Sequence, residues 1–217
     1  KPNEHEYKVM GLAPYAKDSD FRNIYDIFKE LIWVDGLMFK SRVPTRHFGL
    51  YLENKLANLR FDSIAGAVQK FTEDLLVAWV KNAIKITGIR TLAFGGGVFL
   101  NVKANQKIAN LKEVKQSFFM PSASDDMNAI GACYYGQQLK VQSYIKPLSS
   151  LYLGPEYSEL EVLKELRKHP ALRFEKPKHM TKTVSKLLNQ GQIVARFAGR
   201  MEMGARALGN RSILADP

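Results

Sequence analysis

The stretch Thr91–Asn101 reads TLAFGGGVFLN, and the interpretation of the chain starts from it. A short apolar run ends in Gly95, Gly96 and Gly97, and a helical pattern follows. Three consecutive residues without a Cβ let backbone N–H groups approach a ligand closely, and the N-terminus of the next helix favours an anion. Tight strand-to-helix turns that bind nothing use the same residues. This stretch alone therefore leaves open a phosphate or nucleotide cradle and a bare turn.

The elements around the glycines predict an α/β fold with a mainly parallel layer, because strands and helices alternate. The predicted elements are a helix from the N-cap Asp62 to Thr87 that is closed by Gly88, a strand at Thr91–Phe94, a helix through about Ile108, a strand at Gln116–Met120, and a helix from Asp126 to about Leu139.

The residues before this layer predict a turn-rich connector, a helix and a hairpin. The connector is Met10–Ala16, and the helix is Phe21–Leu31, whose apolar residues share one face. Two short runs, Leu31–Val34 and Leu37–Lys40, flank an Asp-Gly pair, which is typical of a two-residue β-hairpin turn.

A segment without clear periodicity near residue 150 predicts a domain boundary, which gives domains at 1–148 and 149–217. The predicted elements of the second domain are a helix that begins with the capping box Ser158–Glu161 and ends near His169, a strand at Leu172–Glu175, a helix ending at Gln190–Gly191, and a strand at Ile193–Phe197.

The composition, with 46% apolar and 24% charged residues, is that of an ordinary globular protein. No apolar stretch is long enough to span a bilayer and no secretory signal is visible, so we expect no membrane association. The single cysteine, Cys133, excludes an internal disulfide and favours a cytoplasmic location. The net charge of +11 suits phosphorylated small molecules better than nucleic acid, because no long Lys/Arg run is present. The chain opens without Met and stops directly after a motif, so we expect a fragment.

Asp125 and Asp126 lie in a Ser/Asp-rich turn at a helix start, beyond the second strand of the layer. One reading is helix N-capping by Ser124 or Asp125. The other is an oxygen ligand for a metal at the carboxyl edge of the sheet, where ligands gather in open α/β sheets. Asn101, one helical turn beyond Gly97, likewise has two readings, a contact to a ribose or base and a helix-surface amide.

The segment 199–217, GRMEMGARALGNRSILADP, interleaves arginines with glycines. Arginine offers a planar set of donors that suits phosphate or carboxylate, and glycines let the backbone come close. We interpret this segment as an anion site, with a basic surface loop as the alternative.

Taken together, the motifs resemble the NodU/CmcH-type O-carbamoyltransferases, in the same order and over nearly the whole chain. The motifs are KVMGLAPYA (8–16), FGGGVFLNVKANQKI (94–108), PSASDDMNAIGA (121–132), LGPEYSELEV (153–162) and the segment 199–217, which is the most specific. The resemblance implies an actin/sugar-kinase-like (ribonuclease H-like) ATPase domain followed by the start of a YrdC-like domain. It also implies that carbamoyl phosphate and ATP form carbamoyl-adenylate, from which the carbamoyl group passes to a hydroxyl of a sugar-containing acceptor.

The resemblance also implies site residues. The residues matched to nucleotide binding are Gly95, Gly96, Gly97 and Asn101. The metal, iron(II) or another divalent ion, is matched to Asp125, with Asp126 as the alternative. The residues matched to the phosphates of carbamoyl phosphate or ATP are Arg200, Arg206, Asn210, Arg211 and Ser212. A homodimer is a candidate assembly.

The chain departs from the family pattern at several positions. Ser124-Asp125-Asp126-Met127 replaces the usual Gly-Asp-x-Gly, and Ala205 replaces a proline, so that turn should be less rigid. The family's paired histidine metal ligands have no counterpart here, so we expect residues 1–217 alone to be inactive. Two alternatives remain: a tRNA threonylcarbamoyl-type transferase, disfavoured by residues 151–217, and a nucleotide-binding protein without catalysis.

Overall fold

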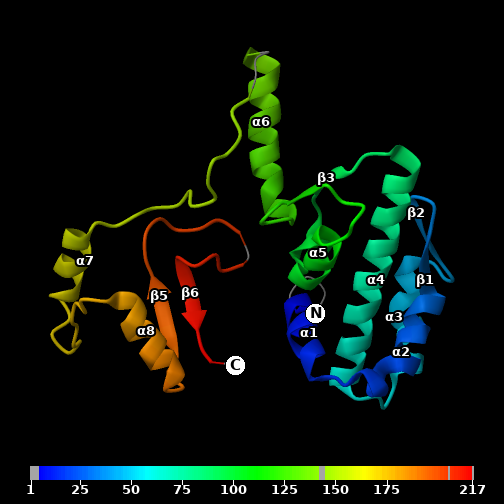
Figure 1. The fold of residues 1–217 in the computed structure, drawn as a ribbon, viewed down its shortest axis with the longest axis horizontal. Helices are drawn as coiled ribbons and strands as arrows, with labels where there is room; N and C mark the ends of the chain where they lie inside the picture. Colours follow the sequence, from blue (N-terminus) through cyan, green and yellow to red (C-terminus); the bar gives the residue numbers. More distant parts are fainter. Residues whose placement is uncertain (1–4, 142–144, 205, 217) are drawn as a thin grey trace. The chain divides into compact units, whose positions relative to one another are not determined.

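The computed structural model describes residues 5–141, 145–204 and 206–216, and these form two compact units, Lys1–Ala123 and Ser124–Pro217 (Figure 1). The structure is mixed α/β, as the sequence predicts, and its described sheets are all two-stranded. The predicted domain boundary at 148 and 149 stays a prediction. Within the described ranges, no helix combines the length and apolar character that crossing a bilayer requires.

The first unit is built on the long helix α4 (Phe61–Thr87). Its other elements are α1 (Glu6–Leu12), η1 (Ala13–Tyr15), α2 (Asp18–Leu31), β1 (Ile32–Asp35), β2 (Met38–Ser41), η2 (Thr45–His47), α3 (Phe48–Leu56), β3 (Thr91–Phe94), η3 (Gly97–Leu100), α5 (Val102–Ala109) and β4 (Gln116–Phe119).

Helix α4 contributes to two apolar clusters, one along each half of its length. In its N-terminal half, Ala67 and Phe71 pack against Ile24 and Phe28 of α2. In its C-terminal half, Leu76, Val80 and Ile84 pack against the residues of β3, η3 and α5 that follow. These positions repeat at helical spacing, so one helix face places the β3–α5–β4 segment.

Strands β3 and β4 pair in parallel, with Thr91 opposite Gln116 and Phe94 opposite Phe119, and α5 makes the crossover between them. The parallel strand–helix–strand prediction is therefore confirmed. The predicted hairpin is confirmed as well, since β1 and β2 pair antiparallel. Its two-residue turn is Gly36–Leu37, one residue later than predicted, because Asp35 belongs to β1 and pairs with Met38.

The N-cap prediction for α4 is wrong, because the helix begins at Phe61 with Arg60 as its N-cap residue. Asp62 lies inside the first turn, where its carboxylate accepts hydrogen bonds from the Arg60 guanidinium and from the Ser63 amide. The predicted closure by Gly88 is confirmed, because Gly88 adopts the left-handed conformation with φ 71°.

The predicted connector at Met10–Ala16 is instead helical, since α1 runs directly into η1. Pro14 is compatible with this path because it lies in the first turn of η1, where its missing N–H has no intrahelical partner to lose.

The second unit contains η4 (Asp125–Met127), α6 (Asn128–Val141), α7 (Glu159–Leu166), α8 (Met180–Asn189), β5 (Val194–Phe197) and β6 (Arg211–Leu214). The capping box is confirmed, with the Glu161 amide donating to Ser158 Oγ and the Ser158 amide donating to Glu161. The predicted strand at Leu172–Glu175 is wrong: Leu172 and Phe174 are exposed, and no strand among the described residues pairs with that segment. Strands β5 and β6 pair antiparallel, so the segment 199–217, called the signature segment below, returns along β5.

Candidate functional site

The glycine turn at the carboxyl end of β3 is open to solvent. Gly96 has φ 105°, a conformation that residues with a Cβ rarely adopt. No atom lies within 4 Å of the position a Cβ would take at Gly95, Gly96 or Gly97. Within the described ranges, the amides of Gly95 and Gly96 donate to no protein acceptor. The turn therefore has the space and the donors that an anionic ligand needs, and nucleotide binding there stays a prediction.

An aromatic cluster from β3, η3 and β4 packs next to this turn. Phe94, at the end of β3, stacks on Phe119 of β4 with ring centroids 4.6 Å apart, and it also contacts Phe99 of η3. Phe94 and Phe99 are buried. The turn is thus anchored on both sides by rings of the core while its glycines stay exposed.

Asn101 is the N-cap of α5, so it is neither a free surface amide nor an isolated ligand-binding residue. Its Oδ1 accepts from the Ala104 amide at 3.2 Å. It also exchanges two hydrogen bonds with Gln69 of α4: Asn101 Nδ2 donates to Gln69 Oε1 at 2.9 Å, and Gln69 Nε2 donates to Asn101 Oδ1 at 3.1 Å.

Glu73 extends this network and is a buried charge that the sequence interpretation missed. The residue is 7% exposed. Its Oε1 accepts from Gln69 Nε2 at 2.7 Å, and its Oε2 lies 2.5 Å from Lys107 Nζ of α5. A sequence signal existed, because Gln69 and Glu73 continue the buried stripe of Leu76 and Val80 at helical spacing. Polar residues in phase with an apolar stripe indicate buried hydrogen bonding.

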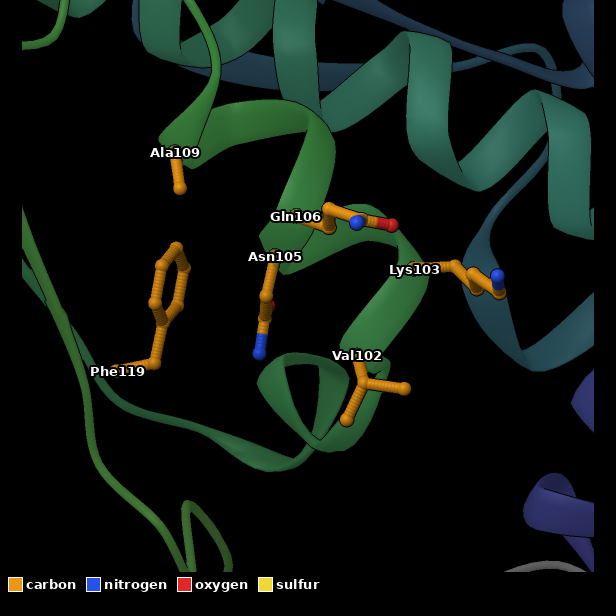
Figure 2. A pocket seen from close by; sticks show the side chains of 6 residues that line it. All are labelled: Val102, Lys103, Asn105, Gln106, Ala109 and Phe119. Atoms are coloured by element: carbon orange, nitrogen blue, oxygen red, sulfur yellow. The ribbon is translucent and has the colours of Figure 1, made fainter.

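A shallow hollow of about 460 Å³ lies beside α5, and it does not include the glycines (Figure 2). It is lined by Val102, Lys103, Asn105, Gln106, Ala109 and Phe119. Asn105 Nδ2 donates to the Phe99 carbonyl at 2.7 Å, whereas its buried Oδ1 has no partner among the described residues. The lining is mostly apolar, so the hollow offers few groups that could bind an ion.

Asp125 begins η4 in the second unit, and its side chain is exposed. Ser124 is the N-cap residue of this turn, but its side chain makes no capping hydrogen bond. The side chain of Asp126 lies outside the described part of the structure. Among the described residues, no group of three or more His, Cys, Asp or Glu side chains could hold a metal ion. A single carboxylate does not make a metal site, so the described residues alone do not fit the expected iron.

The signature segment packs against 151–155, so two of the motifs lie side by side. The Gly154 amide donates to the Met201 carbonyl at 2.9 Å, and the Met201 amide donates to the Pro155 carbonyl at 2.9 Å. A Cβ at Gly154 would stand 2.6 Å from Met201 Cβ, so only glycine permits this approach. Arg200 adds hydrogen bonds to the carbonyls of Gly154 and Leu153, at 3.1 and 3.2 Å.

Glu202 organises the return of this segment into β6. Its carboxylate accepts from the amides of Asn210 and Arg211, at 3.0 and 3.2 Å. Partial burial by itself would raise the pKa of Glu202, but the amides of Leu208, Asn210 and Arg211 and the charge of Arg211 outweigh it. The pKa of this carboxyl therefore lies below its ordinary value, and the sequence interpretation assigned Glu202 no role.

Arg211 mainly holds the loop together. Its guanidinium lies 3.6 Å from the centroid of the Phe197 ring, and it donates to the carbonyls of Ala198, Gly199 and Asn210. Asn210 Nδ2 donates to the Arg200 carbonyl, and Ser212 Oγ accepts from the Gly209 amide. With Arg200, four of the five predicted phosphate-binding residues therefore have contacts that hold this segment in shape.

Arg206 is partly buried. Ala205 lies outside the described residues, so the lower rigidity predicted for its turn stays a prediction. Phosphate binding by Arg200, Arg206, Asn210, Arg211 and Ser212 stays a prediction. The glycine turn belongs to the first unit, and Asp125 and the signature segment belong to the second.

Two family models match the chain. The one described as the carbamoyltransferase N-terminus matches residues 1–134, and the one described as the carbamoyltransferase C-terminus matches residues 185–217. The second match contains the β5–β6 pair and the signature segment, whereas the first contains the whole glycine turn.

Similar proteins match over nearly the whole chain. An uncharacterised protein of Methanocaldococcus jannaschii is 32% identical over 100% of this chain and 37% of its own length. Nodulation protein NolNO of Sinorhizobium fredii is 30% identical over 98% of the chain and 32% of its own length. The 3'-hydroxymethylcephem-O-carbamoyltransferase of Streptomyces clavuligerus is 33% identical over 96% of the chain and 38% of its own length. The chain thus spans less than half the length of these relatives.

Proposed function

Because this chain belongs to the carbamoyltransferase family, we propose that the whole protein transfers a carbamoyl group to a hydroxyl of a small, sugar-containing acceptor. The observation that carries the proposal is the joint match of both family models, with the glycine turn inside one and the signature segment inside the other. The name of one relative, a hydroxymethylcephem O-carbamoyltransferase, supports a hydroxyl group as the acceptor.

The proposed reaction uses carbamoyl phosphate as donor and ATP as activator. Water hydrolyses carbamoyl phosphate to carbamate and phosphate. A carbamate oxygen then attacks the α-phosphorus of ATP, the bond to the bridging oxygen of pyrophosphate breaks, and pyrophosphate leaves carbamoyl-adenylate behind. The acceptor hydroxyl oxygen then attacks the carbamoyl carbon, the bond to the adenylate oxygen breaks, the hydroxyl proton is lost and AMP leaves. Such steps need donors placed where negative charge develops on the phosphates.

This chain supplies two sets of such donors. The exposed amides of Gly95 and Gly96 suit the phosphates of a bound nucleotide. In the signature segment, Arg200 and Arg206 stay the candidates for a ligand contact. Arg200 also donates to backbone carbonyls, but its hydrogen bonds to described residues use only Nε and Nη2, whereas both terminal nitrogens of Arg211 are directed at loop carbonyls. We assign Arg211, Asn210 and Ser212 the role of shaping that loop.

The finer fold assignment is part of the proposal. The parallel β3–α5–β4 unit supports an actin/sugar-kinase-like first domain, because ligands of such layered folds lie at the carboxyl ends of parallel strands. The match of residues 185–217 supports a YrdC-like second domain. The exposed, unpaired Cys133 supports a reducing, cytoplasmic location.

Asp125 remains the metal-ligand candidate of this chain, with Asp126 as the alternative. Since the described residues do not complete a site, no step of the reaction above is assigned to a metal. We expect further ligands to come from outside residues 1–217.

The test is incubation of the full-length protein with ATP, carbamoyl phosphate and a panel of hydroxyl-bearing acceptors, followed by mass spectrometry. The proposal expects an acceptor that gains one carbamoyl group only when both ATP and carbamoyl phosphate are present. Modification of tRNA in place of a small acceptor would favour the threonylcarbamoyl-type alternative. Nucleotide binding without any carbamoyl transfer would favour a protein that has lost catalysis.

A further inference from the structure

Three polar side chains behind the glycine turn form one continuous hydrogen-bonded chain from Glu73 through Gln69 to Asn101. Lys107 closes its far end by pairing with Glu73. The chain connects α4 to α5 next to η3, the turn that the glycines begin. These polar groups therefore lie close in sequence and structure to the proposed nucleotide site.

Each amide in this chain has one allowed orientation. A carboxylate can only accept, so Gln69 must present Nε2 to Glu73. The Ala104 amide can only donate, so Asn101 must present Oδ1 to the start of α5. These two requirements are independent, and the hydrogen bonds exchanged between Gln69 and Asn101 satisfy both.

The orientation limits what Asn101 can offer a ligand. Its Oδ1 already accepts from Ala104 and from Gln69, which occupies both of its lone pairs. Its Nδ2 donates one hydrogen to Gln69 Oε1 and retains the other. Asn101 is half-buried, so part of the residue stays exposed to solvent.

We propose that Gln69 and Glu73 are positioning residues, which fix the Asn101 side chain as a hydrogen-bond donor toward the nucleotide. This inference rests on the proposed nucleotide-binding role of the glycine turn. The group bound at Asn101 must then be an acceptor, either a ribose oxygen or an unprotonated ring nitrogen of the base. A nucleoside group that can only donate is excluded from that position.

The test is a charge swap in the full-length protein. In Glu73→Gln, Lys107 still requires an acceptor, so the new amide nitrogen faces Gln69, and both amides are driven toward the wrong orientation. In Gln69→Glu, two carboxylates face each other. In the double variant Q69E/E73Q, the carboxylate at position 69 accepts from the amide at position 73 and from Asn101 Nδ2, so the donor orientation of Asn101 is favoured again. The hydrogen bond from position 69 to Asn101 Oδ1 is not restored, because a carboxylate cannot donate.

We expect each single variant to raise the KM and the Kd for ATP about tenfold, the effect of losing one well-oriented hydrogen bond. The double variant should recover part of the loss, to about threefold above the wild type, since the pairing between positions 69 and 73 and the donation by Asn101 Nδ2 are restored while the donation to Asn101 Oδ1 is not. The KM for carbamoyl phosphate should not change in any of them. The matched control is Asp74→Asn, which removes a neighbouring carboxylate of α4 that also pairs with a lysine, and it should leave all constants unchanged.

A structural role alone would lower the yield or the melting temperature but would not raise the KM for ATP selectively. Single variants that bind ATP like the wild type, or a folded double variant that does not recover ATP binding, would overturn the inference while leaving the proposed function in place. Where the single variants do not fold, the double variant and Asn101→Asp decide. Aspartate is a good N-cap but cannot donate, so the inference requires that N101D lose ATP binding. Absence of ATP binding by the wild-type protein in equilibrium dialysis would overturn both this inference and the proposed function.

Discussion

Glu73 illustrates how a single buried charge links two helices. Its two oxygens are engaged by Gln69 and Lys107, and its side chain is 10% exposed, whereas that of Lys107 is 43% exposed. Removing Glu73 leaves the part-buried Gln69 amide without this acceptor, whereas the half-exposed Lys107 ammonium can bind water instead.

We therefore predict that Glu73→Ala destabilises the full-length protein by about 1–3 kcal/mol, because Gln69 and Lys107 both lose an acceptor. The control is Lys70→Ala, which removes the exposed Lys70–Asp74 pair of the same helix and should cost no more than about 1 kcal/mol. Urea denaturation followed by circular dichroism measures both. Equal effects of the two substitutions would mean that the Glu73 network contributes nothing beyond an ordinary surface pair.

Glu202 gives a pH-dependent prediction. Its folded-state pKa lies below the ordinary value of 4.5, so its contribution is fully present above that value and is lost as the pH falls through the lower, folded-state pKa. We predict that the amide resonances of Asn210 and Arg211 shift together with a midpoint below 4.5 in an NMR titration. Glu202→Gln should abolish that transition. A midpoint at or above 4.5 would show that the carboxylate does not hold these two amides.

At the scale of elements, two glycines within helices have opposite surroundings. A Cβ at Gly66 of α4 would stand 2.6 Å from Ala16 Cβ and 2.9 Å from Phe21 Cδ1, so the residue permits close packing of α4 against the preceding segments. A Cβ at Gly131 of α6 would meet nothing within 4 Å.

We predict that Gly66→Ala destabilises the protein by about 1–3 kcal/mol through overpacking, although alanine is the better helix former. Gly131→Ala should stabilise it by about 0.5–1 kcal/mol, because only the helix preference changes there. Thermal unfolding of the two variants beside the wild type measures the difference. The packing of α4 against Ala16 and Phe21 would be contradicted if both substitutions were stabilising.

The elements with strong local signals could be predicted from the sequence. Gly36 in the hairpin turn, the Ser158–Glu161 capping box and Gly88 each determine a turn or helix end through their own chemistry, although the turn lies one residue later than the Asp-Gly pattern predicts. Elements that depend on a partner could not be predicted in this way. The run Leu172–Glu175 has strand-forming residues, but a strand exists only where another strand pairs with it.

As with the helices and strands, the parts of the candidate site with a local sequence signal could be predicted, and the parts that depend on distant residues could not. The glycine turn and its position at the end of β3 follow from local pattern, and both are found. The spacing of Gln69 and Glu73 indicates buried polar groups, but it does not identify their partner. Gln69 and Asn101 are far apart in sequence and meet only when α4 packs on α5. Glu202 was equally inaccessible, since its partners are backbone amides that any residue could supply.

At the scale of the whole molecule, this chain matches only part of the length of its relatives. The chain spans 37% of the length of the Methanocaldococcus relative and 38% of that of the cephem O-carbamoyltransferase. Among the described residues there is no set of ligands that could hold a metal ion. We therefore predict that residues 1–217 alone show no acceptor carbamoylation, measured by mass spectrometry with ATP and carbamoyl phosphate. Turnover by this segment alone would show that the metal ligands expected from outside it are not required.

The most direct test of the central claim is a mass-spectrometric assay of the full-length protein with hydroxyl-bearing acceptors, in four reactions that contain both, either or neither of ATP and carbamoyl phosphate. The account predicts an acceptor heavier by one carbamoyl group in the complete reaction alone, together with release of AMP. A complete reaction in which no acceptor of the panel gains that group and no AMP is released would contradict the assignment of this protein as an ATP-dependent O-carbamoyltransferase.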